Sequence, residues 1–117
     1  MSIEWIYHKD RKILYISYIN LSAPQMLDQI REAAKIIAAT RSQDNLTLTD
    51  ITGCNIDNKF IDLAKEQSKT SLLLTKKAAI IGIYGIRKMV LDMINSVSPK
   101  QRKPFATKQE AMDWLAE

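Results

Sequence analysis

The segment KKAAIIGIYG at residues 76–85 decides the fold of this chain. Its apolar centre predicts a buried strand, and its two glycines, Gly82 and Gly85, predict a turn where that strand ends. The residues that follow, 86–97, repeat apolar side chains at helical spacing. A buried strand that leads through a turn into an amphipathic helix is typical of an α/β fold.

This helix at 86–97 is predicted to bury one apolar stripe. Leu91 falls on the other side of the helix, outside the stripe. The predicted stripe consists of Ile86, Met89, Val90, Met93, Ile94 and Val97.

The C-terminal segment adds a strand and a helix. A short strand is expected to end at Phe105, and Thr107 is expected to be the N-cap of a terminal helix. Glu110, three residues later, occupies the matching position of a capping box. This helix is predicted to bury Ala111, Trp114 and Leu115.

The N-terminal segment predicts an antiparallel hairpin followed by a helix. Residues 3–8 and 13–19 are rich in β-branched and aromatic side chains, and the polar residues 9–12 have the length of a hairpin loop. Ser22 and Gln25 then form a capping-box pattern. The apolar stripe of the helix that follows consists of Met26, Leu27, Ile30, Ala33, Ala34 and Ile37.

The middle of the chain predicts one more strand and one more helix. Residues 46–51 indicate a short strand, and a helix is expected from about Asp57. The run 72–74 is either the last turn of that helix or a packed loop. The predicted order is ββαβαβαβα, a mixed sheet with about four helices and right-handed crossovers between its parallel strands.

The composition indicates one soluble globular domain over residues 1–117. Of the residues, 46% are hydrophobic and 26% are charged, and no apolar run is long enough to cross a bilayer. The chain begins without a signal-like segment and has one cysteine, Cys54, which predicts a cytoplasmic location. The net charge of +4 favours acidic partners or anionic membranes too weakly to decide, so peripheral membrane contact stays open.

Three segments together resemble the SpoIIAA-like group of STAS-type domains. They are DITG at 50–53, AIIGIYG at 79–85 and PFATKQEAMDWL at 104–115, and the likeness extends over nearly the whole chain. The resemblance implies a mixed sheet with helices mainly on one side. It also implies a non-enzymatic, regulatory role in binding other proteins or, in some branches, small apolar or anionic ligands.

The resemblance also raises the question of a phosphorylation switch. Anti-sigma-factor antagonists of this group are phosphorylated on a serine within an Asp-Ser-Ser-Gly motif, and the matching residues here are Asp50, Ile51, Thr52 and Gly53. Ile51 occupies the serine position and has no hydroxyl group. We therefore expect no kinase control here, unless Thr52 takes the place of the serine.

The loop after residue 50 is the predicted partner-binding site. Gly53 permits positive φ, and the backbone N–H groups of such a turn suit an anion or a partner's carboxylate. The alternative is a purely structural turn in which Thr52 or Asn55 caps the next helix. Cys54 has a lowered pKa if it lies in that helix's first turn, and otherwise is a small buried hydrophobe. The predicted partner-binding residues are Asp50, Thr52, Gly53 and Asn55.

The turn after the 76–85 strand is the predicted ligand-binding site. Its glycines allow close approach of a ligand to the backbone, and two cations follow at a helix N-terminus. In the alternative, Gly82 lets a helix pack over the strand, Gly85 makes the turn and the cations are solvated. The predicted ligand-binding residues are Gly82, Gly85, Arg87 and Lys88.

Other chemistry is not expected. His8 is the only histidine and has no acid or cysteine at a metal-ligand spacing, so no catalytic site, metal or cofactor is predicted. The basic residues form no stripe, which argues against nucleic acid. A response-regulator receiver, suggested by Lys103-Pro104-Phe105 and Asp50, needs an acidic pair that the early strands lack.

Two functions therefore remain. The first is a regulatory domain that binds a protein, and the alternative is a carrier or sensor of a small apolar or anionic ligand. The oligomeric state stays open, a homodimer included.

Overall fold

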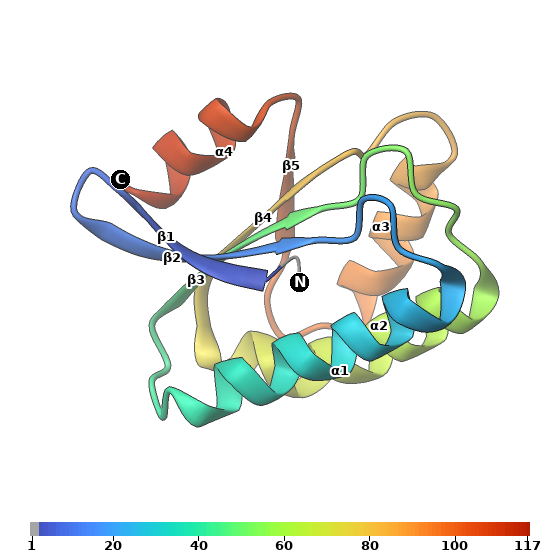
Figure 1. Cartoon of the computed structure of the whole chain (residues 1–117), viewed down its shortest axis with the longest axis horizontal. Helices are drawn as coiled ribbons and strands as arrows, with labels where there is room; N and C mark the ends of the chain where they lie inside the picture. The colour runs from blue at the N-terminus through green and yellow to red at the C-terminus, as the bar shows by residue number, and fades with distance from the viewer. Residues whose placement is uncertain (1–2) are drawn as a thin grey trace.

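The computed structural model describes residues 3–117, which form a five-stranded sheet between two layers of helices (Figure 1). The strand order is β1-β2-β3-β4-β5, with β1 antiparallel to β2 and all later pairs parallel. The elements are β1 (Ile3–His8), β2 (Arg11–Ser17), α1 (Ala23–Ala39), β3 (Asn45–Asp50), α2 (Asn58–Ser71), η1 (Leu72–Leu74), β4 (Thr75–Ile81), α3 (Arg87–Ser96), β5 (Arg102–Phe105) and α4 (Lys108–Leu115). The predicted α/β class and element order are confirmed.

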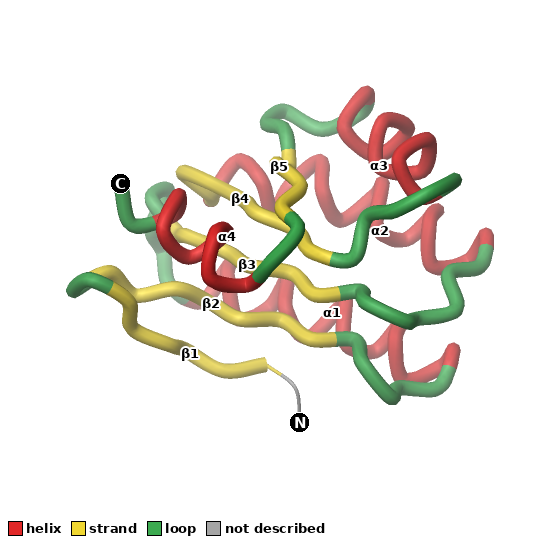
Figure 2. Tube along the Cα trace, turned by 90° about the horizontal axis from the view of Figure 1, so that it is seen from above, coloured by secondary structure: helices red, strands yellow, loops and turns green. Residues whose placement is uncertain are grey.

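The helices divide unequally between the two faces of the sheet. α1, α2 and α3 connect parallel strands, and crossovers of one hand place all three on the same face. α4 follows the last strand and lies on the opposite face, across β3, β4 and β5 (Figure 2). The predicted arrangement, with helices mainly on one side, is therefore confirmed.

The N-terminal hairpin is tighter than the sequence predicts. Lys9 and Asp10 both have positive φ, at 49° and 63°, and alone connect His8 to Arg11. Two successive left-handed residues suit the right-handed twist of a hairpin. The predicted four-residue loop is wrong because the polar Arg11 and Lys12 belong to β2, at its exposed end.

The helix starts follow local hydrogen-bonding chemistry. The N–H of Gln25 donates to Ser22 Oγ (3.3 Å), and the N–H of Ser22 donates to Gln25 Oε1 (2.8 Å), so the predicted capping box is complete. Thr107 caps α4 by accepting from the N–H of Glu110 (3.2 Å). That box is incomplete, since the Glu110 carboxylate accepts from the Thr107 hydroxyl and not from its backbone (3.0 Å).

α2 begins at Asn58, which is too late for Thr52 or Asn55 to be its N-cap. Asp57 is its N-cap and accepts a hydrogen bond from the N–H of Phe60 (2.9 Å). The suggestion that Thr52 or Asn55 caps this helix is therefore wrong, because Asp57 occupies the N-cap position and both residues precede it. The run Leu72–Leu74 is a 3₁₀ turn that continues the helix, as the first of the two predicted alternatives has it.

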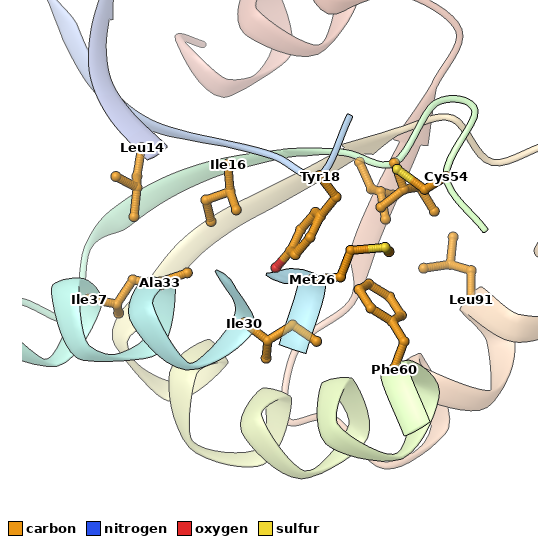
Figure 3. Packing of buried hydrophobic residues seen from close by; sticks show 12 residues of the cluster. Leu14, Ile16, Tyr18, Met26, Ile30, Ala33, Ile37, Cys54, Phe60 and Leu91 are labelled. Carbon is orange, nitrogen blue, oxygen red and sulfur yellow. The ribbon is translucent and has the colours of Figure 1, made fainter. Parts of the chain in front are cut away.

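Each face of the sheet has its own hydrophobic core. The larger core joins the sheet to α1, α2 and α3, and Figure 3 shows side chains from β2, α1 and α2 meeting within it. The smaller core lies under α4. Its buried members are Ile13, Leu46, Leu48, Ala79, Ile81, Ala111 and Leu115.

α3 is rotated relative to its prediction. Leu91 and Ile94 are the buried residues of this helix, whereas Ile86 is 77% exposed and Met89 is 65% exposed. The predicted burial of Ile86, Met89, Met93 and Val97 is wrong, as is the solvent position of Leu91. No helix within residues 3–117 has the length and apolar character to cross a membrane.

Trp114 lies at the edge of the smaller core and is only partly buried, not fully as predicted. Its ring packs against Phe105, with centroids 5.4 Å apart, and Lys77 and Lys103 lie over it. Replacement of Trp114 by alanine should therefore cost about 2–3 kcal/mol, below the range for a fully buried tryptophan. Urea unfolding measures this cost, and a loss under about 1 kcal/mol would show that the ring adds little to the core.

Candidate functional site

The two predicted sites lie side by side at the carboxyl ends of β3 and β4. Residues 51–57 follow β3, and residues 82–86 follow β4. Because these strands are parallel neighbours, their following loops leave the sheet at the same edge (Figure 1). The N–H of Ile51 donates to the carbonyl of Ile81 (3.0 Å), which extends the strand pairing into the loops.

Gly82 brings the backbones of the two loops into contact. Its φ is +97°, and a Cβ atom at this position would lie 2.5 Å from the nitrogen of Thr52 and 2.8 Å from the carbonyl carbon of Ile51. Gly82 therefore permits packing against a neighbouring loop, not against a helix as the structural alternative predicts. Gly85, with φ +57° and open space around it, makes the turn into α3 as predicted.

Arg87 connects the two loops through its guanidinium group. Nη1 donates to the carbonyls of Ile51 (2.8 Å) and Gly82 (3.0 Å), and Nη2 donates to the carbonyl of Cys54. The guanidinium also lies over the ring of Tyr84, 4.5 Å from its centroid. The solvated position given to Arg87 in the structural alternative is thus wrong, while Lys88 is exposed.

The first backbone donors of the loop, those of Thr52, Gly53 and Cys54, are occupied within the protein. The N–H of Thr52 donates to Asp50 Oδ1 (2.9 Å), that of Gly53 to the Tyr84 hydroxyl (3.3 Å) and that of Cys54 to the carbonyl of Ile51 (3.1 Å). These N–H groups are not free to receive an anion. The loop instead presents the side chains of Thr52 and Asn55, which are exposed together with Gly53.

Asp50 holds this loop through a hydrogen bond between its carboxylate and the N–H of Thr52. It is buried, and its second carboxylate oxygen accepts a hydrogen bond from the Tyr15 hydroxyl (3.3 Å). Its position between the end of the sheet and the N–H of Thr52 makes it a determinant of loop shape. Of the four predicted partner-binding residues, Asp50 is thus the one that lies beneath the surface.

Cys54 is a small buried hydrophobe, the second of the two alternatives predicted for it. α2 starts at Asn58, so Cys54 lies before its first turn. Burial raises the pKa of the thiol, and nearby Arg87 partly offsets this rise.

The N-terminus of α3 has its first backbone donors occupied within the protein. The N–H groups of Arg87, Lys88 and Met89 donate to the carbonyls of Tyr84, Gly85 and Ile86.

An exposed apolar strip borders the loop at 51–57. It consists of Tyr84, Ile86, Met89 and Met93, of which even the least exposed, Met93, is 46% accessible; we call it the α3 strip. The hydrogen bond from Gly53 to Tyr84 joins the strip to the loop. The sequence pattern predicts burial of three of these residues, Ile86, Met89 and Met93, because apolar side chains occupy both sides of this helix.

His8 participates in a different structural contact. Its Nε2 lies 2.7 Å from Asp113 Oδ1, and Lys9 Nζ lies 3.3 Å from the same oxygen, so the hairpin is attached to α4. The hydrogen bond with His8 lowers the pKa of the Asp113 carboxyl. Within residues 3–117, no group of three or more His, Cys, Asp or Glu side chains is placed to hold a metal ion.

Comparisons with known proteins identify the fold. No protein-family model and no curated protein matches the sequence. An uncharacterized protein of the DUF3478 family from Shewanella loihica, with a SpoIIAA-like fold, matches 97% of this chain and 91% of its own at 18% identity and a TM-score of 0.70. An anti-sigma-factor antagonist (STAS) domain protein from Planctomyces limnophilus matches 98% of both chains at 18% identity and a TM-score of 0.56. The predicted STAS-type, SpoIIAA-like fold is thereby confirmed.

Proposed function

We propose that this SpoIIAA-like domain is a non-enzymatic regulatory module that binds a protein partner. The docking surface combines the exposed loop residues Thr52, Gly53 and Asn55 with the α3 strip. The observation that carries the proposal is the exposure of four large apolar side chains next to a polar, well-anchored loop. Contiguous exposed apolar patches with polar borders are typical of protein interaction sites. The fold is also that of a known anti-sigma-factor antagonist domain.

The surface is held in shape before any partner arrives. Arg87 fixes three carbonyls beneath it, and Gly82 keeps the two loops in backbone contact. A surface that is already ordered loses little conformational entropy on binding, which favours affinity. We therefore assign Arg87 and Gly82 a positioning role, with Asp50 alongside them under the loop.

A phosphorylation switch at the position that resembles the serine does not fit this surface. Ile51 has no hydroxyl group, and its side chain belongs to the larger core, with 4% of its surface exposed. Thr52 is the exposed hydroxyl nearest to it. We therefore expect that intact mass spectra of the protein from its native cells show no phosphoryl group on Thr52 in most molecules.

Substitution of Met89 by glutamate tests the docking surface. A charge in the centre of the α3 strip should abolish capture of the partner, because an apolar contact would have to bury an unpaired carboxylate. Thr52→Asp should weaken capture through the loop. The measurement is quantitative mass spectrometry of proteins that tagged full-length chain retains from the source organism's lysate.

Leu73→Glu is the matched control. Leu73 is also apolar and 56% exposed, but it lies in η1, before β4 and away from the strand-end loops. The proposal expects a protein that wild type and Leu73→Glu retain and that Met89→Glu loses, with unchanged melting temperatures. If sedimentation shows a dimer that Met89→Glu alone disrupts, the partner is a second copy. Equal retention by all forms would contradict the proposal.

A second candidate function, a carrier or sensor of a small ligand, is favoured by a different observation. A cavity of about 80 Å³ lies between the sheet and α1, α2 and α3, and its lining is largely apolar. Pockets with apolar walls and a few polar groups are typical of small-molecule sites.

A further inference from the structure

The cavity between the sheet and the helices is lined by two cationic side chains and by no acidic ones. Its lining comes from β2, α1, β3, α2, β4, α3 and β5, and includes Arg87 and Arg102 but no aspartate or glutamate. Most other lining residues are aliphatic or aromatic, among them Ile30, Phe60 and Leu72. A positively charged site with apolar walls complements a ligand that has an anionic head and an apolar body.

The two arginines differ in the donors that they have available. The guanidinium of Arg87 is committed to three backbone carbonyls of the strand-end loops. The side chain of Arg102 makes one hydrogen bond within residues 3–117, from Nη1 to Ser68 Oγ (2.7 Å), and no ion pair there. A guanidinium has five N–H donors in a fork that matches a carboxylate. Arg102 therefore has unused donors, and it is one of the residues that line the cavity.

Tyr18 supplies a second donor. It is 5% exposed, its ring is fixed by an edge contact with Phe60 (5.3 Å between centroids), and its hydroxyl makes no hydrogen bond to another described residue. No fully enclosed side-chain polar atom in residues 3–117 lacks a partner, so this hydroxyl keeps some accessible surface, and Tyr18 is one of the residues that line the cavity. Figure 3 shows it pointing from the sheet toward the helices. Burial raises the pKa of Tyr18, which keeps the hydroxyl protonated as a donor.

We propose that this cavity binds a short-chain aliphatic carboxylate, with Arg102 and Tyr18 holding the carboxylate and the aliphatic lining holding the tail. The volume limits the tail, because about 80 Å³ is roughly half of the 150 Å³ that holds benzene in an engineered cavity. A carboxylate of about two or three carbons, which has fewer non-hydrogen atoms than benzene, suits that space. The inference rests on the second candidate function and is independent of the docking surface.

The cavity also has a physical signature of a ligand site. Burial lowers the pKa of the Arg102 guanidinium, which means that its charge is less favourable there than in water. A partly buried cation without a carboxylate partner costs stability in the empty protein. A bound carboxylate would remove that cost.

A titration of the full-length protein with propionate, followed by methyl NMR, tests the site. The methyl signals of Ile30, Leu72 and Ile94, which line the cavity, should shift and saturate. 1-Propanol has the same tail without the charge and should bind at least tenfold more weakly. Octanoate should also bind more weakly than propionate, because its tail exceeds the cavity. Tighter binding of octanoate would overturn the short-chain assignment.

Substitutions test whether Arg102 and Tyr18 hold the carboxylate without disturbing the fold. Arg102→Met should weaken propionate binding at least tenfold while the melting temperature stays within a few degrees of wild type, since the loss of the hydrogen bond to Ser68 is offset by removal of a charge that lacks a carboxylate partner. Tyr18→Phe removes only the hydroxyl and should weaken binding several-fold, and it serves as the test if Arg102→Met fails to fold. Lys76→Met, the same loss of charge at an exposed position, should bind like wild type.

The outcomes distinguish the failures. Saturable methyl shifts that Arg102→Met and Tyr18→Phe leave unchanged would overturn the anchor and leave the second candidate function standing. Equal affinity for propionate and 1-propanol would overturn the assignment of a carboxylate head group. No shift with any probe would overturn the inference and the ligand-carrier function together.

Discussion

Replacement of Gly82 by alanine is expected to destabilise the protein by about 3–5 kcal/mol. Two costs add at this position. An L-residue at φ +97° is strained by about 1–2 kcal/mol, and the new methyl group overlaps backbone atoms, at 2.5 Å from the Thr52 nitrogen. Backbone cannot rotate away as a flexible side chain can, so the loops at 51–57 and 82–86 must separate. Chemical unfolding of the purified variant measures the loss.

Gly85→Ala is the matched control for this prediction. Gly85 also has positive φ, at +57°, but nothing lies within 4 Å of a Cβ atom built there. Its loss should therefore be only about 1 kcal/mol, the strain alone. Equal losses for the two variants would mean that the loops do not depend on the close approach at Gly82. Gly53→Ala, also in open space at φ +72°, should behave like Gly85→Ala.

Substitution of Arg87 by methionine is expected to cost about 2–4 kcal/mol, because three carbonyls lose a charged donor that no other described side chain supplies. Methionine keeps most of the aliphatic length, so the loss reports the hydrogen bonds. The effect should also be local. Hydrogen exchange of the Gly53 and Cys54 amides should accelerate more than that of the amides in the centre of β3.

Two further variants serve as controls for Arg87→Met. Lys88→Met removes the same charge from an exposed position and should change stability by less than about 0.5 kcal/mol. Arg87→Lys keeps the charge but not the planar fork, and should lose an intermediate amount. If Arg87→Met unfolds at the same denaturant concentration as Lys88→Met, the guanidinium does not hold the loops together.

The local elements could be predicted because their causes are local. Ser22 and Gln25 lie three residues apart, and their reciprocal hydrogen bonds form as soon as the first turn of α1 does. The alternation of strands and helices is likewise enough to predict parallel pairing with helices on one face. The hairpin loop was predicted two residues too long because polar residues occur both in turns and at exposed strand ends.

The exposed face of α3 could not be predicted from its own sequence. Apolar residues occur on two sides of this short helix, and periodicity alone favoured the side with Met89 and Met93. In the structure the row that contains Arg87, Leu91 and Ile94 faces inward. Burial of this row lets the guanidinium reach carbonyls of both loops, a constraint that involves residues far apart in the chain. The α3 strip is what remains exposed.

By itself the sequence determined the order of the elements, the capping of α1 and α4, and the glycine turns at the strand ends, since each depends on residues within a few positions of one another. Only the tertiary structure decided that the loops after β3 and β4 form one surface and that Asp50 lies beneath it. It also decided that Arg102 and Tyr18 both line one cavity. The physical reason is that these arrangements depend on strand pairing and helix packing between distant segments, whose contacts leave no periodic pattern in the chain.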